Sequence, residues 1–426
     1  MGDGQTFEAC GDHGARRDRG RSGAAVVEVE RLEPRELWSA VVPNDTAYAQ
    51  QWNLKGVNAP AAWAKGTGSA AVLVGHVDTG IDYTHPDLYK NVWINQAEIP
   101  PALKGKLKDT DGDKRISFWD LNATANKGRV ADGNKNGYID GGDLLAKWKP
   151  DGTGGWADGI NGKNNPNDKY VDDIVGWDFA NNDNNPIDPD GHGTHTAGVI
   201  AAEGNNKRGV AGVVWKASLV ALKVFGDSPT DGATLTAIAA AIRYAADVGA
   251  RVANNSYSNG GGSVGDPIYN AVKYANGKGM LTVFAAGNDT ADNDRSWLAS
   301  YPASFDLPNI ISVAATDKSG DLAAYTNYGR KSVDIAAPGT SVYSTWRGGT
   351  YRTDTGTSMA TPHVTGTIAL MLSLNPKLTA AQLKSRLLAG ADQTAKLVGS
   401  STTGGILNVA NAVNGLAGKR VATAAR

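Results

Sequence analysis

The sequence has a single cysteine, no long apolar run and almost no net charge. The lone Cys10 excludes an internal disulfide framework and any cysteine-based metal site. No run of about 18 consecutive apolar residues occurs, so we expect no transmembrane segment. The formal net charge of −1 gives no field that would attract nucleic acid or an anionic membrane. We therefore expect no nucleic-acid partner.

The chain is long, and its first residues differ from the rest. With 426 residues, 41% of them hydrophobic, we expect one large α/β domain with insertions, or two domains. The N-terminal residues lack the apolar centre of a secretory signal, but they contain VERLEPRELWSA. This stretch resembles the LEPR-type segment of many exported or surface-associated bacterial proteins; a frayed tail is the alternative. We expect tails at 1–42 and 415–426, and a secreted or cell-surface bacterial protein.

From about residue 69, short apolar runs alternate with segments of helical periodicity. The runs that predict strands are residues 70–78, 218–224, 251–258, 279–288, 310–316 and 332–338. Residues 233–249 and 359–376 have the spacing of helices, and Gly249 and Pro376 supply stop signals. This alternation predicts an α/β fold with a mostly parallel central sheet and helices on both faces. Functional sites in such sheets lie at the carboxyl ends of the strands.

Three motifs fall at predicted strand ends or helix starts. They are VLVGHVDTGIDYTHPDL with Asp78, DGHGTHTAG with His192, and GTSMATPHVTG with Ser358. A serine hydroxyl is a poor nucleophile unless an imidazole takes its proton and a carboxylate orients that imidazole. Each motif alone is weak, since HGTH by itself could be a pair of metal ligands. Together, in the order Asp, His, Ser, they predict nucleophilic catalysis.

These motifs resemble, almost letter for letter, those of the subtilisin-like serine proteases, the subtilases. The resemblance runs from about residue 43 to 413, and VPNDTAYAQQWNL resembles the mature start of the thermitase-like branch. It implies a three-layer subtilisin-like fold for a peptidase domain at 43–414. It also implies a serine endopeptidase that works through an acyl-enzyme, with Asp78 orienting, His192 as general base and acid, and Ser358 as nucleophile.

The same resemblance assigns further site residues. Asn288 of VFAAGND would stabilise the oxyanion together with the backbone N–H of Ser358. The primary substrate pocket would be lined by Ser256, Tyr257 and Ser258 on one side and by Ala285, Ala286 and Gly287 on the other, with Ser300 at its floor. Ser258 stands where the family usually has glycine. Phe225 and Leu235 would border neighbouring subsites, and no acidic residue suggests a trypsin-like preference. We expect His195 to be structural and Asp82 to lie at the surface.

The resemblance also implies calcium as a cofactor. A tight site would take side chains from Asp45, Asp87 and Asn206, and the backbone carbonyls of Gly204, Arg208 and Val210. Oxygen ligands of this kind suit a hard cation. Solvated loop residues without metal are the alternative.

A second calcium region is predicted from the residues themselves, in an insertion at about 100–175. Asp78 and His192 are 114 positions apart, and residues 109–190 hold 16 Asp and no Glu against 9 Lys and Arg. The stretch DGNKNGYIDGGD has the ligand spacing of a calcium loop, with Asp132, Asn134, Asn136, the carbonyl of Tyr138, Asp140 and Asp143. A poorer copy, DTDGDKRISFWD, offers Asp109, Asp111, Asp113 and Asp120 but has Lys114 at the turn; NNPNDKYVDD is weaker still. A metal-free, turn-rich surface loop is the alternative.

The predicted function is hydrolysis of protein or peptide substrates by a calcium-stabilised monomer. A catalytically silent, calcium-dependent surface protein on a subtilase scaffold is the alternative from another class. Only about forty residues precede the mature-like start, fewer than a folded pro-segment needs. We therefore expect either metal-assisted folding without such a segment or an incomplete gene product.

Overall fold

The computed structural model describes residues 40–149, 154–159, 169–228, 231–258, 262–263 and 265–421. The predicted N-terminal tail, with Cys10 and the LEPR-type stretch, lies outside the described residues apart from 40–42. The weakest calcium-like stretch is described only from residue 169, and the C-terminal tail only to residue 421.

The described residues form a central sheet of nine strands. Its order is β10 (Asp392–Gln393), β11 (Gly405–Ile406), β7 (Ile335–Pro338), β6 (Ile310–Thr316), β5 (Leu281–Ala285), β4 (Val252–Asn255), β1 (Gly68–Asp78), β3 (Lys216–Lys223) and β2 (Gly176–Asp178). All neighbours pair in parallel except β10 and β11. Strands β5 and β6 are buried at every residue, as expected for a parallel sheet covered on both faces. The six predicted strands and the mostly parallel sheet are confirmed.

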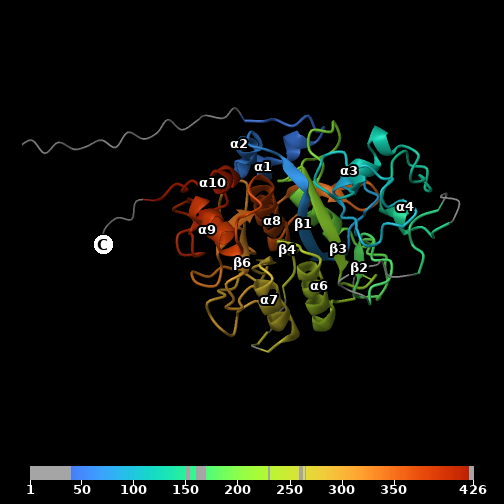
Figure 1. Cartoon of the computed structure of the whole chain (residues 1–426). Helices are drawn as coiled ribbons and strands as arrows, with labels where there is room; N and C mark the ends of the chain where they lie inside the picture. Colours follow the sequence, from blue (N-terminus) through green and yellow to red (C-terminus); the bar gives the residue numbers. More distant parts are fainter. Residues whose placement is uncertain are drawn as a thin grey trace, which may run out of the picture. The chain divides into compact units, whose positions relative to one another are not determined.

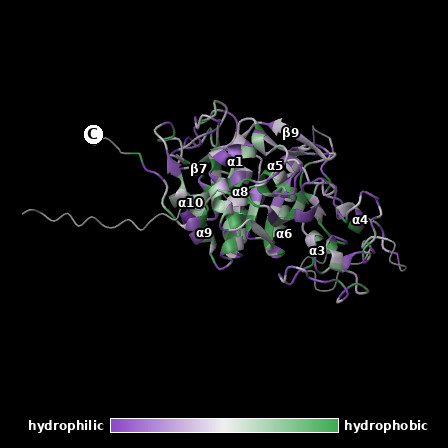
Figure 2. Ribbon diagram, turned by 90° about the horizontal axis from the view of Figure 1, so that it is seen from above, coloured by the Kyte–Doolittle hydropathy of each residue, from purple (hydrophilic) through white to green (hydrophobic). Residues whose placement is uncertain are grey.

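Helices cover both faces of this sheet (Figure 1). On one face, α8 (Thr357–Leu374) contacts β1, β4, β5, β6 and β7, and α5 (His192–Ala201) packs beside it. On the other face, α6 (Leu235–Asp247) and α7 (Pro267–Gly277) pack against each other and against β1, β3 and β5. The two faces hold separate hydrophobic clusters. Figure 2 shows hydrophobic residues gathered around α8 and α6.

Local sequence explains why these helices begin where they do. Thr234 accepts a hydrogen bond from the backbone N–H of Ala237 at the start of α6, and Asp266 accepts one from Ile268 at the start of α7. The predicted helices at 233–249 and 359–376 correspond to α6 and α8 and are confirmed.

Shorter elements complete the fold. Helices α9 (Ala380–Gly390) and α10 (Val409–Asn414) pack against α8. Helix α2 (Ala59–Trp63) packs against α10 and α1 (Trp52–Gly56), and η1 (Tyr48–Gln50) precedes α1. Strands β8 (Val342–Trp346) and β9 (Thr350–Asp354) form an antiparallel hairpin against α5. This hairpin leads directly into the start of α8 and so positions Ser358.

Little regular structure occurs in the part of the predicted insertion that the structure describes. Its elements are η2 (Tyr89–Asn91) at its entry, α3 (Phe118–Leu121), η3 (Thr124–Asn126) and α4 (Gly141–Leu145). Phe118, Leu144 and Trp156 are buried in the main hydrophobic cluster, so the described part of the insertion is packed onto the core. The loop at 132–143 lacks the long flanking helices of a calcium sensor, as its sequence indicates.

Candidate active site

The fold brings the three motifs to the carboxyl ends of the strands. Asp78 is the last residue of β1, His192 is the first residue of α5, and Ser358 lies in the first turn of α8. These residues are far apart in sequence. They meet because parallel strands present their carboxyl ends at one edge of the sheet, where the following helices begin.

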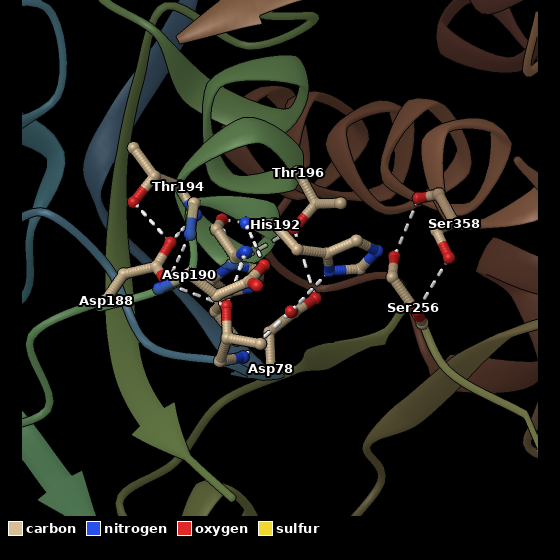
Figure 3. Close-up of polar contacts among 12 residues, drawn as sticks. Asp78, Asp188, Asp190, His192, Thr194, Thr196, Ser256 and Ser358 are labelled. Atoms are coloured by element: carbon tan, nitrogen blue, oxygen red, sulfur yellow. Dashed lines mark hydrogen bonds and ion pairs between the residues drawn. The ribbon is translucent and has the colours of Figure 1, made fainter. Parts of the chain in front are cut away.

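Asp78 and His192 form a direct pair. The distance from His192 Nδ1 to Asp78 Oδ1 is 2.7 Å, and the Asp78 side chain is fully buried (Figure 3). Asp78 also accepts hydrogen bonds from the backbone N–H of Thr79 at 2.8 Å and from Thr196 Oγ1 at 3.2 Å. These contacts fix the carboxylate, and the carboxylate in turn fixes the ring of His192.

The electrostatics of this pair favour a charged imidazole. Burial alone would raise the pKa of Asp78, but the charge and hydrogen bond of His192 outweigh it, and the pKa is lowered. Burial alone would lower the pKa of His192, but the charge and hydrogen bond of Asp78 raise it above its ordinary value. The site therefore stabilises the imidazolium that forms when His192 takes a proton.

Ser358 does not hydrogen-bond His192 in this structure. Its Oγ donates to the backbone carbonyl of Ser256 at 2.8 Å, and Ser256 Oγ donates to the carbonyl of Ser358, also at 2.8 Å. Figure 3 shows Ser256 and Ser358 on the side of the His192 ring opposite to Asp78. A rotation of the Ser358 side chain is needed to bring its hydroxyl to the imidazole.

Asn288 is held by its side-chain oxygen, and its amide nitrogen makes no hydrogen bond to the residues that the structure describes. Its Oδ1 accepts hydrogen bonds from the backbone N–H and the hydroxyl of Thr357, both at 2.9 Å. This contact directs Nδ2 toward Gly356, beside the first turn of α8. The backbone N–H of Ser358 belongs to the same turn, where N–H groups have no partner within the helix and the helix dipole favours negative charge.

The predicted pocket residues follow two neighbouring strands. Ser256, Tyr257 and Ser258 follow β4, and Ala285, Ala286 and Gly287 end or follow β5, which pairs with β4. Ser258 is exposed, whereas Tyr257 packs against Phe225 and Phe284 and donates to Asn255 at 2.8 Å. The Tyr257 ring is therefore fixed beside the predicted pocket by the core.

Gly287 has no room for a side chain. Its φ is +114°, and a Cβ there would lie 2.3 Å from Asn327 Nδ2 and 3.1 Å from Ser300 Oγ. Ser300 is buried and therefore lies next to the wall, at the position expected for a pocket floor. Only glycine fits this conformation and this contact together.

Two expectations about neighbouring residues have different outcomes. His195 is buried and its Nε2 contacts the carbonyl of Val342 at 3.0 Å, which agrees with a structural role. The expectation that Asp82 lies at the surface is wrong, because only 4% of it is exposed. The Asp82 carboxylate accepts hydrogen bonds from Thr84 and from the backbone of the β8–β9 turn at Gly348, which bury it.

One important residue was not identified in the sequence. Asp188 is buried and accepts hydrogen bonds from Thr79 Oγ1 at 2.9 Å, Gly191 N at 2.8 Å, and Thr194 N and Oγ1 at 2.7 and 2.6 Å. It thus joins the end of β1 to the start of α5 and sets the approach of His192 to Asp78. Its place four residues before His192, in an acidic run, was the available signal.

Comparison with known proteins agrees with this geometry. The sequence profile of the subtilase family matches residues 69–412. The chain belongs to the subtilase family. This is a family of subtilisin-like serine endopeptidases, and the prediction made from the three motifs is confirmed at this level.

Individual relatives of this subtilase are proteases. The chain is 45% identical to thermitase of Thermoactinomyces vulgaris over 203 residues, which are 47% of this chain and 67% of thermitase. It is 33% identical to a thermophilic serine proteinase of Bacillus sp. (strain AK1) over 347 residues, covering 81% of this chain and 63% of that relative. An extracellular protease of Xanthomonas campestris is 32% identical over 405 residues, which cover 89% of this chain and 56% of that relative.

A solved structure supports the fold assignment. A protease from Pseudoalteromonas arctica PAMC 21717 superposes with a TM-score of 0.59 at 28% identity. The match covers 88% of this chain and 99% of that one. The subtilisin-like three-layer fold is thereby confirmed.

Three distant segments of the subtilase meet around Asp45 and Asp87. Asp45 accepts a hydrogen bond from the backbone N–H of Asn205 at 2.8 Å, and Asp87 accepts one from Val210 at 2.9 Å. Asn206 Nδ2 donates to Asp87 Oδ1 at 2.6 Å. Burial raises the pKa of Asp45, and it raises the pKa of Asp87 to about 7. The residues predicted to form the tight calcium site are thus brought together, with two buried carboxylates.

In the loop at 132–143, hydrogen bonds connect several of the predicted ligands. Asp132 accepts hydrogen bonds from the backbone at Asn136 and Gly137, and Asp143 accepts one from Gly133. Asn134 and Asn136 both donate to Asp140, at 3.2 and 2.6 Å. The ring of Tyr138 stacks on Tyr89 at 4.1 Å, which ties the loop to the core.

The loop at 109–120 has the same hydrogen-bond plan. Its first residue, Asp109, accepts from the sixth, Lys114, at 2.8 Å, and its last, Asp120, accepts from the second, Thr110, at 2.7 Å. Lys114 adopts φ +69°, so the turn is preserved without glycine. Carboxylate oxygens of Asp109, Asp111 and Asp120 lie within 4.8 Å of one another.

Proposed function

We propose that this subtilase is an active serine endopeptidase in which Ser358 is the nucleophile, His192 the general base and acid, and Asp78 the orienting carboxylate. The observation that carries the proposal is the buried 2.7 Å contact between Asp78 and His192, with Ser358 on the other side of the ring. A paired carboxylate and imidazole beside a serine at a helix N-terminus is the arrangement that activates a hydroxyl.

The first half of the reaction forms an acyl-enzyme. Ser358 Oγ turns from the Ser256 carbonyl to His192 and attacks the carbonyl carbon of the scissile peptide bond, while its proton passes to His192 Nε2. The carbonyl electron pair moves onto oxygen, where Asn288 Nδ2 and the Ser358 N–H donate hydrogen bonds. The C–N bond then breaks, and His192 gives its proton to the leaving amine.

The second half returns the enzyme to its starting state. Water attacks the ester carbonyl while His192 takes a proton from it, and the C–O bond to Ser358 then breaks as His192 returns the proton to Oγ. Asp78 remains ionised throughout, because its role is to hold the tautomer and stabilise the imidazolium. The raised pKa of His192 is consistent with that role.

Substrates would be protein or peptide chains in extended form. Such a chain can pair with the backbone after β4, at Ser256 to Ser258, as an added strand. The side chain of the substrate residue whose carbonyl is attacked would then lie between that segment and Ala285 to Gly287, over Ser300. The exposed hydroxyl of Ser258 would border this pocket.

Calcium fits the cluster of Asp45, Asp87 and Asn206. Two carboxylates whose pKa values are raised mainly by burial lack a compensating positive charge, and a bound cation would supply it. The carbonyls of Gly204, Arg208 and Val210 would complete the oxygen ligands. When bound, calcium would supply no chemistry to the reaction; it would stabilise the fold by linking three segments.

Calcium also fits the two insertion loops, at 132–143 and 109–120, but the two loops do not suit it equally well. Asp132, Asn134, Asn136, Asp140, Asp143 and the Tyr138 carbonyl would hold one ion. At the second loop, Asp113 Oδ2 is buried and accepts no hydrogen bond from the described residues. A bound cation would satisfy this oxygen. Lys216 contacts Asp111 and would compete with the ion there.

The proposed location is outside the cell. No helix among the described residues is long and apolar enough to cross a membrane, and one relative is named an extracellular protease. The protein would act as a secreted or surface-associated monomer.

The test is a Ser358→Ala variant compared with the parent on casein. We expect the variant to lose hydrolysis and labelling by a serine-directed fluorophosphonate, and to keep its circular dichroism spectrum. A parent that is neither labelled nor active would favour the silent-scaffold alternative. Substantial cleavage by the pure variant would remove Ser358 from the mechanism.

A further inference from the structure

A small acidic cavity adjoins His192. It has a volume of about 230 Å³, and its lining includes Asp190, His192, Phe225, Asp231 and Ser256. Pockets for whole small molecules are usually about 300–1,000 Å³, so this cavity suits a single side chain. It contains the proposed base and one residue of the proposed pocket, and it therefore belongs to the substrate-binding cleft.

Asp190 is fixed in this cavity by the start of α5. Its Oδ1 accepts a hydrogen bond from the backbone N–H of His192 at 3.1 Å, and the residue is half-buried (Figure 3). Among the described residues no other donor contacts its side chain, so the second oxygen is available to a ligand. The carboxylate cannot move far without losing the bond to His192.

Asp231 supplies the second negative charge of the lining. It is exposed, and its Oδ2 accepts a hydrogen bond from the backbone N–H of Ser228 at 3.2 Å. No lysine or arginine is among the described residues that line the cavity. The buried Lys223, eight positions before Asp231, is already paired with Asp178 at 2.6 Å and Asp227 at 2.8 Å.

An extended substrate would direct one particular side chain here. If the residue whose carbonyl is attacked places its side chain between the segments after β4 and β5, the preceding residue points to the other side, because side chains alternate along a strand. That side carries His192 and the acidic cavity. The ring of Phe225 would cover the methylene stem of a long side chain, and the two carboxylates would face its charged end.

We propose that this cavity selects lysine or arginine at the substrate residue immediately before the one that occupies the primary pocket. The inference rests on the proposed function, since it assigns specificity to the same cleft. Two unit charges about 4 Å apart interact by about 1 kcal/mol in water and more near a protein surface. Partial exposure limits the gain, so we expect lysine to exceed glutamine by about tenfold in kcat/KM, the rate equivalent of about 1.4 kcal/mol.

The experiment uses three peptides that are identical except for lysine, glutamine or glutamate at this position. kcat/KM is measured for the parent, Asp190→Asn, Asp231→Asn and the double variant, with Asp306→Asn as the control. Asp190→Asn keeps an oxygen to accept from His192 N, so the backbone contact is retained while the charge is lost. Asp306 is exposed and does not line this cavity, and its substitution changes net charge equally.

We expect the lysine-to-glutamine ratio to fall about threefold in each single variant and to approach one in the double variant, mainly through KM. The ratio should stay unchanged in Asp306→Asn and should decrease in about 0.5 M salt, where charges are screened within a few ångströms. Asp231→Lys, at an exposed position, should turn the preference toward glutamate.

Two results would overturn the inference in different ways. A parent ratio near one, or a ratio that survives the double substitution, would show that the cavity does not select a basic side chain while hydrolysis itself stands. A parent that cleaves none of the peptides and takes no fluorophosphonate would overturn the proposed function and this inference with it.

Discussion

Asp87→Asn should separate the effect of calcium from that of the polypeptide alone. The side chain of Asp87 is fully buried, and burial raises its pKa to about 7. Asparagine has nearly the same volume and carries no charge. Without calcium the variant should therefore melt no lower than the parent, because it no longer holds a buried charge that lacks a counter-charge. With calcium it should melt lower, because the ion loses a central ligand.

The size of the calcium effect follows from mass action. An ion that binds only the folded state stabilises it by about 2.7 kcal/mol at a hundredfold excess over its dissociation constant. The compact unit spans Ser39–Arg426, and an unfolding entropy of about 2 cal/mol/K per residue converts that energy into a Tm increase of about 3 °C. Asp132→Asn should remove less of this increase, because its loop is local and orders only part of the insertion.

The assay is a set of thermal scans over a calcium titration, with EDTA as the zero point. All variants are made in the Ser358→Ala background, so that autolysis does not distort the transitions. Plots of Tm against calcium concentration for the parent and for Asp87→Asn should cross as calcium is added. Melting that is identical and independent of calcium in the parent and both variants would show that these loops bind no metal and that the ligand assignment is wrong.

Three further results are expected. Asn288→Ala should lower kcat by about 10²–10³, the range known for the corresponding donor of subtilisin, with little change in KM, since the contact is made in the transition state; a rise in KM at constant kcat would contradict this. The pKa of His192 is raised, and the base must be neutral, so the acid limb of the kcat/KM profile should lie above pH 6.5 and should move down in Asp78→Asn; an unmoved limb would argue against the pair. Gly287→Ala should destabilise the fold by about 1–3 kcal/mol in denaturant titrations because of its left-handed φ and the 2.3 Å approach to Asn327, whereas Gly277→Ala, in open space at the end of α7, should not.

The sequence alone was sufficient for the fold class and the family, and it predicts the catalytic residues. Strands β5 and β6 are buried at every residue and mostly apolar, because parallel strands covered on both faces admit few polar residues, and such runs can be read without a structure. Asp78, His192 and Ser358 could be assigned because each lies in a short motif whose chemistry requires those residue types. The spacing of Asp132 to Asp143 likewise matches the ligand spacing of a calcium loop and predicts one.

Other features depend on contacts between segments that are distant in the chain. The burial of Asp82 depends on the β8–β9 turn more than 260 residues later, and no local pattern encodes that approach. The hydroxyl of Ser358 donates to Ser256 rather than to His192, a choice made by the neighbouring segment after β4. The acidic cavity likewise brings together Asp190 and Asp231, which lie on separate segments of the chain. Side-chain direction and burial are properties of packing, and only the tertiary structure decides them.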